Sequence, residues 1–135
     1  MTGPVSALRK AVRQRLVDDA ALLALLGGPR VHDEPPRAAE PPYVTFGPAS
    51  AAAWNAGAVA GRRHALSLVV WSRQGGDAEA LAIAARLEEL LDDATLTLEG
   101  HRLVLLSVSG LETARPDRAG LRRVTLRLAA LTEPL

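Results

Sequence analysis

The stretch HALSLVVW, residues His64 to Trp71, has the pattern of a buried strand. Leu66, Leu68 and Val70 alternate along it, and most of the residues between them are apolar as well. A strand with apolar residues on both sides of its pleat is covered on much of both faces.

Further stretches have the pattern of strands. Tyr43 to Phe46 is rich in aromatic and β-branched residues. Thr95 to Leu98 and Arg102 to Leu111 flank a short Glu-Gly turn and predict a hairpin. Arg123 to Leu128 alternates polar and apolar residues, which indicates a last strand with one wet face and one buried face.

Three stretches have helical periodicity. They are Val5 to Val17, Ala20 to Leu26 behind a cap at Asp18-Asp19, and a longer helix from a cap at Asp77 to about Leu91. The order of elements predicts an α+β fold, a mostly antiparallel four- to five-stranded sheet with two helices packed on one face. We expect one domain over residues 1–135, whose other sheet face carries enough polar residues to meet water or another subunit.

The segment from Ala49 to Gly61 is mostly alanine and glycine, with too little apolar area to offset the entropy of ordering. It predicts a mobile loop or arm in the isolated chain. Trp54 and its neighbour Asn55 lie within it, and tryptophan supplies a large contact area with few rotatable bonds. Two interpretations stay open, in which Trp54 contacts a neighbouring subunit or folds back on its own domain.

Composition excludes several classes of protein. The chain has 135 residues and no cysteine, which excludes disulfides, thiol catalysis and cysteine-bound metals. Lysine and arginine total 16 against 15 acidic residues, so no global positive field would hold nucleic acid. No apolar run reaches the roughly 18 residues that span a bilayer, and we expect a soluble, cytoplasmic protein without membrane partners.

Chemical motifs are absent from the sequence. His32, His64 and His101 are far apart and lack the spacing of metal ligands. Gly75-Gly76 resembles a phosphate-binding turn but lacks the lysine and hydroxyl residue that such a turn requires. The acidic pairs do not converge as Mg²⁺ ligands would, since neighbours on a helix point in different directions. We therefore predict no catalytic, cofactor-binding or metal-binding residue.

Two arginine pairs are the remaining candidates. Arg62-Arg63 and Arg122-Arg123 stand at the starts of two predicted strands, where they would meet along one sheet edge and contact phosphates. The alternative is that they are ordinary solvated strand ends. Together with the residues of the alanine-rich segment, the candidate subunit or partner interface is Trp54, Asn55, Arg62, Arg63, Arg122 and Arg123.

A family resemblance runs along nearly the whole chain. The segments that carry it are Leu16–Gly27, Arg30–Asp33 with Pro35, Pro42–Val44, His64–Arg73, Gly100–Leu103 and Thr132–Pro134. In this order and spacing they resemble the small tail-completion or tail terminator proteins of long-tailed phages, prophages and gene transfer agents, long known as a domain of unknown function. The region after Pro48 departs from the family in its alanine content, so family contacts there are not transferred.

The resemblance implies a structural protein and not an enzyme. Such proteins form a hexameric ring that caps the head-proximal end of the tail tube, stops its polymerisation and joins it to the neck. The implied partners are further copies of the chain, the tube protein, the neck or connector protein and, transiently and non-specifically, passing DNA. The implied locations are the bacterial cytoplasm during assembly and then the particle, with no cofactor.

Two other functions stay open. One is another neck or head-closure component, which would use the same ring logic with different partners. The other is a small α+β enzyme or ligand-binding domain with a pocket between the helices and the sheet. A monomer with a deep polar pocket would favour the latter, whereas a ring with a central channel would count against it.

Overall fold

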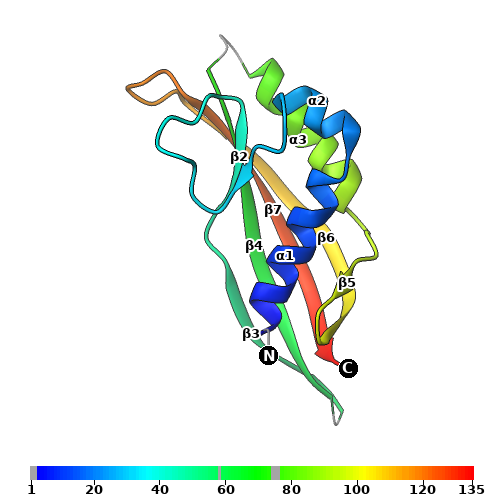
Figure 1. Ribbon diagram of the computed structural model, residues 1–135. Coiled ribbons are helices and arrows are strands. Elements are labelled where there is room, and N and C mark those ends of the chain that lie inside the picture. The colour runs from blue at the N-terminus through cyan, green and yellow to red at the C-terminus, as the bar shows by residue number, and fades with distance from the viewer. Residues whose placement is uncertain (1–2, 58, 74–76) are drawn as a thin grey trace.

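The computed structural model describes residues 3–57, 59–73 and 77–135. Three helices and seven strands are present in these ranges (Figure 1). In chain order they are α1 (Pro4–Val17), α2 (Ala20–Leu26), β1 (Val31–His32), β2 (Tyr43–Phe46), β3 (Ser50–Ala56), β4 (Val59–Ser72), α3 (Ala78–Leu91), β5 (Thr97–Leu98), β6 (His101–Ala114) and β7 (Arg122–Pro134). None of the described helices is both long and apolar enough to cross a lipid bilayer.

The strands form one sheet in the order β1-β2-β4-β7-β6-β5, and β3 pairs with β4 beside β2. The β1–β2 pair is parallel and the other pairs are antiparallel. The α+β class is confirmed, but the predicted four to five strands and two helices are wrong. The sheet is a mixed one of seven strands, and a third helix, α2, packs against α1 and α3. A two-residue strand such as β1 is too short to produce a periodic signal, and the alanines of β3 have weak strand propensity.

The helices cover one face of the sheet. Leu66, Leu68 and Val70 of β4 point toward them and are buried, as the alternation predicts. The Asp92-Asp93 turn after α3 also joins the sheet, since the Asp93 N–H donates to the Leu106 carbonyl at 2.9 Å. The helix side chains of this core are Leu8, Val12, Leu16, Leu22, Leu26, Ile83, Leu87 and Leu91.

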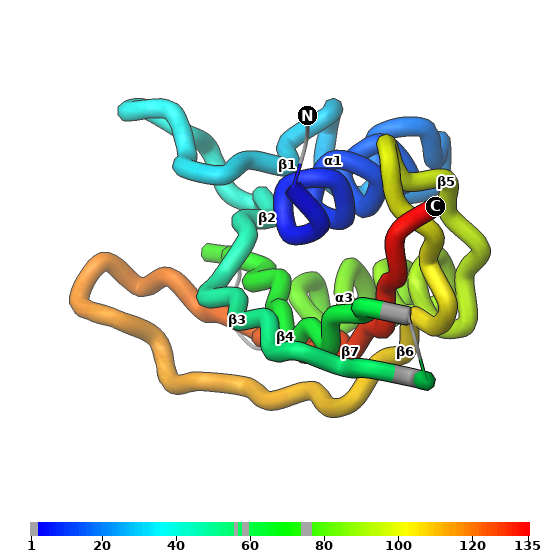
Figure 2. Tube along the Cα trace, turned by 90° about the horizontal axis from the view of Figure 1, so that it is seen from below, coloured from blue at the N-terminus to red at the C-terminus, as the bar shows by residue number. Residues whose placement is uncertain are grey.

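The opposite face of the sheet is open. All the described helices lie to one side of β4 and β7 (Figure 2). Ala65 is exposed on this face, whereas Val69 and Trp71 are half-buried. Ser67, on the same face, is buried. The expectation that this strand is covered on much of both faces therefore holds for the helix side and in part for this side.

The segment predicted as a mobile loop or arm, 49–61, contains two paired strands. Ser50 lies opposite Ala65 and Trp54 opposite Gly61, so β4 starts at Val59 and not at His64. The hairpin extends below the body of the molecule in Figure 1. Its described residues are held by backbone hydrogen bonds to β4, which do not depend on side-chain size. Mobility of the segment in the isolated chain stays a prediction, and we call residues 50–57 and 59–63 the hairpin arm.

Asp19 links α2 to α3. As predicted, it is the N-cap of α2, and its Oδ2 accepts the Leu22 N–H at 2.8 Å. The Arg86 guanidinium donates from Nε to Oδ2 at 2.9 Å and from Nη2 to Oδ1 at 2.6 Å. These Arg86 hydrogen bonds are the main cause that lowers the pKa of Asp19 from 3.8 to about 2, with the Leu22 N–H adding to the effect. One carboxylate thus caps one helix and holds the next.

The Arg86→Met variant is expected to be less stable than the wild type above about pH 4, with a difference that shrinks as the pH falls toward 2. The sign follows from the lowered pKa, because Asp19 in the folded state stays charged where the unfolded chain already binds a proton. The stabilisation is therefore complete above 3.8 and is lost as the pH falls through about 2. Urea unfolding at a series of pH values measures it. Arg37→Met is the control, and a difference that does not change with pH contradicts the assignment.

Gly61 is where the hairpin arm tolerates no side chain. A Cβ there would lie 2.5 Å from Trp54 Cε3, 2.5 Å from the Trp54 carbonyl oxygen and 2.9 Å from the Thr132 carbonyl oxygen. Gly61→Ala is expected to cost about 1–3 kcal/mol, since two of these neighbours are backbone atoms. At Gly110, also within a strand, a Cβ would meet nothing within 4 Å. Gly110→Ala is thus the matched control, and equal unfolding free energies for both variants contradict the prediction.

Candidate functional site

The two arginine pairs lie at opposite ends of the sheet. Arg62 of β4 is paired with Thr132, whereas Arg122 of β7 is paired with Ser72 at the far end of β4. The ten residue-to-residue steps from 62 to 72 correspond to about 33 Å of extended strand. The prediction that the pairs meet along one edge is wrong, because two antiparallel strands begin at opposite ends of their ladder.

Arg122 and Arg123 have partners within the chain. The Arg122 Nη1 lies 3.3 Å from Asp77 Oδ1. Asp77 is the N-cap residue of α3, as predicted, but its side chain makes no capping hydrogen bond. The Arg123 guanidinium lies 5.9 Å from the centre of the Trp71 ring. The Arg122 contact joins α3 to the sheet, and the Arg123 contact joins β7 to β4, so both arginines have a structural role.

Arg62 and Arg63 are both exposed on the hairpin arm. The only described hydrogen bond from an Arg62 side chain goes to the Gly61 carbonyl, at 3.0 Å. Arg63 has no ion pair or hydrogen bond with any residue of the described ranges. Of the two arginine pairs, Arg62-Arg63 is therefore the one whose positive charge is not neutralised by an acidic side chain of the described residues.

Trp54 lies against its own hairpin, and both interpretations of its role stay predictions. Its ring lies over Gly61 and is half-buried, while Asn55 beside it is exposed opposite Ala60. The indole stiffens the hairpin arm and still presents part of its surface. Contact of Trp54 or Asn55 with a second subunit stays a prediction.

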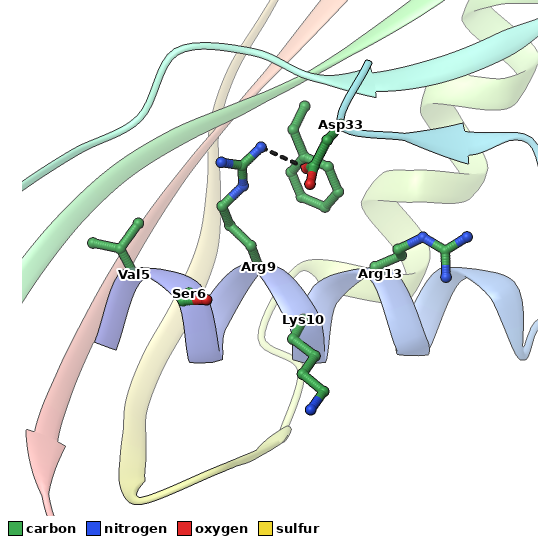
Figure 3. Close-up of a pocket in the computed structure, with 7 residues that line it drawn as sticks. Val5, Ser6, Arg9, Lys10, Arg13 and Asp33 are labelled. Carbon is green, nitrogen blue, oxygen red and sulfur yellow. Dashed lines mark hydrogen bonds and ion pairs between the residues drawn. The ribbon is translucent and has the colours of Figure 1, made fainter. Parts of the chain in front are cut away.

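A basic hollow of about 440 Å³ lies beside α1 (Figure 3). Arg9 donates to Asp33 at 2.7 Å and stacks 4.9 Å from the centre of the Phe46 ring. Arg13 Nε donates to the Val31 carbonyl at 3.1 Å, and Lys10 points away from Arg9 toward Glu99. Because these three cations already serve α1 packing, the hollow has the contacts of a structural joint and not of an anion site.

The residues tested for chemistry remain separate. Within the described ranges, no three histidine or acidic residues gather where they could hold a metal ion. His64 Nε2 is 2.9 Å from Thr132 Oγ1, and burial lowers the pKa of this histidine. Ser107 and Ser109 are strand residues of β6, as expected. The Gly75-Gly76 turn lies outside the described residues.

One feature was not found from the sequence. Asp92 Oδ1 accepts the Val108 N–H at 2.9 Å, so the Asp92-Asp93 pair occupies backbone groups on the outer side of β6. The sequence indicated only caps and solvated faces for the acidic pairs. No local pattern could reveal this contact, because it joins a helix end to a strand sixteen residues further along the chain.

Comparison with known proteins agrees with this absence of chemistry. The family model of tail completion protein gp17 matches residues 10–133. Among solved structures, a chain from the virion of a native gene transfer agent particle is 34% identical. The match covers 98% of this chain and 99% of that chain with a TM-score of 0.87. None of the curated proteins compared with the chain is similar enough to count as a match. The chain therefore belongs to the tail completion protein gp17 family, which consists of structural tail proteins and not enzymes.

Proposed function

We propose that the chain is a tail terminator, a ring that caps the head-proximal end of the tail tube and joins it to the neck. The observation that carries the proposal is the gene transfer agent virion chain, which is similar to this chain over nearly the full length of both. Similarity that covers 98% of this chain and 99% of that chain supports a common role in a particle.

The physical basis is head-to-tail association. In a closed ring, one patch of each copy binds a different patch on the next copy, so a single chain builds the whole assembly. A sheet with helices on one face and an open second face offers several surfaces for the neighbours, the tube and the neck. Function then depends on shape and on the distribution of charge, and it needs no reacting group.

DNA is proposed to pass through the ring with weak contacts. The formal net charge of the chain is +1, which supplies little of the attraction that drives phosphate binding. Weak and non-specific contact suits a channel, since tight binding would slow passage. Assembly would take place in the bacterial cytoplasm, and the ring would then remain in the particle.

Light scattering of the purified chain tests the ring. Six copies of the 14.2 kDa chain would have a mass of about 85 kDa, alone or after mixing with the tube protein from the same gene cluster. The control is Leu87→Asp, which places a charge at a fully buried position and should abolish both folding and the ring. A folded monomer that ignores the tube protein at every concentration contradicts the proposal.

Tube growth separates a terminator from another neck component. Adding the chain to polymerising tube protein is expected to shorten the tubes and to leave a ring at one end, because a cap blocks further addition. Electron microscopy of negatively stained tubes measures both. Unchanged tubes, together with binding to the connector alone, would indicate a head-closure component instead.

A further inference from the structure

Two strands of the sheet keep an unpaired side. β3 pairs with β4 on one side and with no other described strand. β6 pairs with β7 along its length, but on its outer side β5 covers only His101 and Arg102. We call the outer side of Ser50–Ala56 the β3 edge and the outer side of Ser109–Ala114 the β6 edge. Since β3 and β6 lie on opposite sides of the β4–β7 ladder, the two edges face away from each other.

The β6 edge begins after the part of β6 that the Asp92-Asp93 turn covers. The Leu106 carbonyl accepts the Asp93 N–H, and the Val108 N–H donates to Asp92 Oδ1. Beyond Val108, no described strand lies on this side. Leu111 is 43% exposed there, although it is apolar.

The β3 edge lacks the features that keep edges apart. Strand edges in monomeric proteins are blunted by lysines, prolines, charged residues or bulges. Ser50–Ala56 contains no charged residue and no proline, and its pairing with β4 is regular. A flat, neutral edge of seven residues is suited to main-chain pairing with another strand.

Charge differs between two segments of the chain that lie beside these edges. From Tyr43 to Arg73 the chain has three arginines and no acidic residue. From Leu87 to His101 it has five acidic residues and no lysine or arginine. The first segment contains the β3 edge with Arg62 and Arg63. The second ends α3 and places Asp92 beside the start of the β6 edge.

We propose that the β3 edge of one copy pairs with the β6 edge of the next copy, so that the sheet continues from subunit to subunit. This inference rests on the proposed function and names the two surfaces that close the ring. Each copy supplies one edge of each kind, and a closed ring therefore leaves none open.

Charge favours this pairing over pairing of two β3 edges. Two β3 edges together would bring Arg62 and Arg63 of both copies close, because these residues lie opposite Ala53 and Ala52 in the middle of the edge. Pairing β3 with β6 instead places Arg62 and Arg63 of one copy near the acidic turn of its neighbour. The small side chains of Ala52 and Ala53, opposite Arg63 and Arg62, leave space for the guanidinium groups to reach across.

Thiol cross-linking tests the proposal against a background without cysteine. Ala52→Cys marks the β3 edge and Thr113→Cys marks the β6 edge, and both positions are exposed. A short bismaleimide linker tolerates a shift of register between the copies. The expected result is that each single variant stays at 14.2 kDa, whereas an equimolar mixture gives a covalent dimer.

The chain that carries both cysteines extends the test. It is expected to give a ladder of cross-linked species that ends at the copy number of the ring. Ala24→Cys, an exposed position on α2, replaces Ala52→Cys as the matched control and should give no dimer with Thr113→Cys. A dimer from either single variant alone, or no dimer from the mixture, overturns the proposal.

The proposed function and this inference fail in different ways. If light scattering shows a ring of the wild-type chain but the mixture of cysteine variants does not cross-link, the terminator function is supported and the β3–β6 pairing is rejected. If the mixture of cysteine variants cross-links but the wild-type chain neither forms a ring nor caps tubes, the edge pairing is supported and the terminator function is rejected.

Discussion

The ladder between β4 and β7 is the constraint on which the rest of the structure depends. It runs from Arg62 opposite Thr132 to Ser72 opposite Arg122. The helices pack on its one face, the hairpin arm grows from one of its ends, and the remaining strands add to its two sides. Because both strands are long and antiparallel, residues that are neighbours in the sequence pattern can lie far apart in space.

The helices and strands whose apolar side chains repeat at a regular spacing could be predicted from the sequence. The apolar alternation of Leu66, Leu68 and Val70 located β4, and the apolar stripe between Asp77 and Leu91 located α3 within a residue. The hairpin arm could not be predicted, because alanine carries almost no strand signal and the backbone bonds to β4 hold it in place. The relation of the two arginine pairs also failed, since it depends on strand direction and register, which a single sequence does not contain.

The candidate site was less predictable than the fold for a different reason. An enzyme concentrates its chemistry in a few residue types with fixed spacing, which a motif can reveal. A subunit of an assembly distributes its function over edges, faces and charge, and each residue there is ordinary. Arg63 illustrates this. Its guanidinium has no partner among the described residues, whereas Asp77 holds that of Arg122, and only the structure separates the two.

The Asp92-Asp93 turn has a geometric consequence. It uses the outer Leu106 carbonyl and Val108 N–H of β6, so a foreign strand finds no available partners until it has passed Val108. The turn acts as an end stop, which limits how far such a strand can slide and thereby sets its register. Backbone pairing alone repeats every two residues and permits many registers. A helix end that blocks part of an edge removes most of them without requiring any particular side chain on the incoming strand.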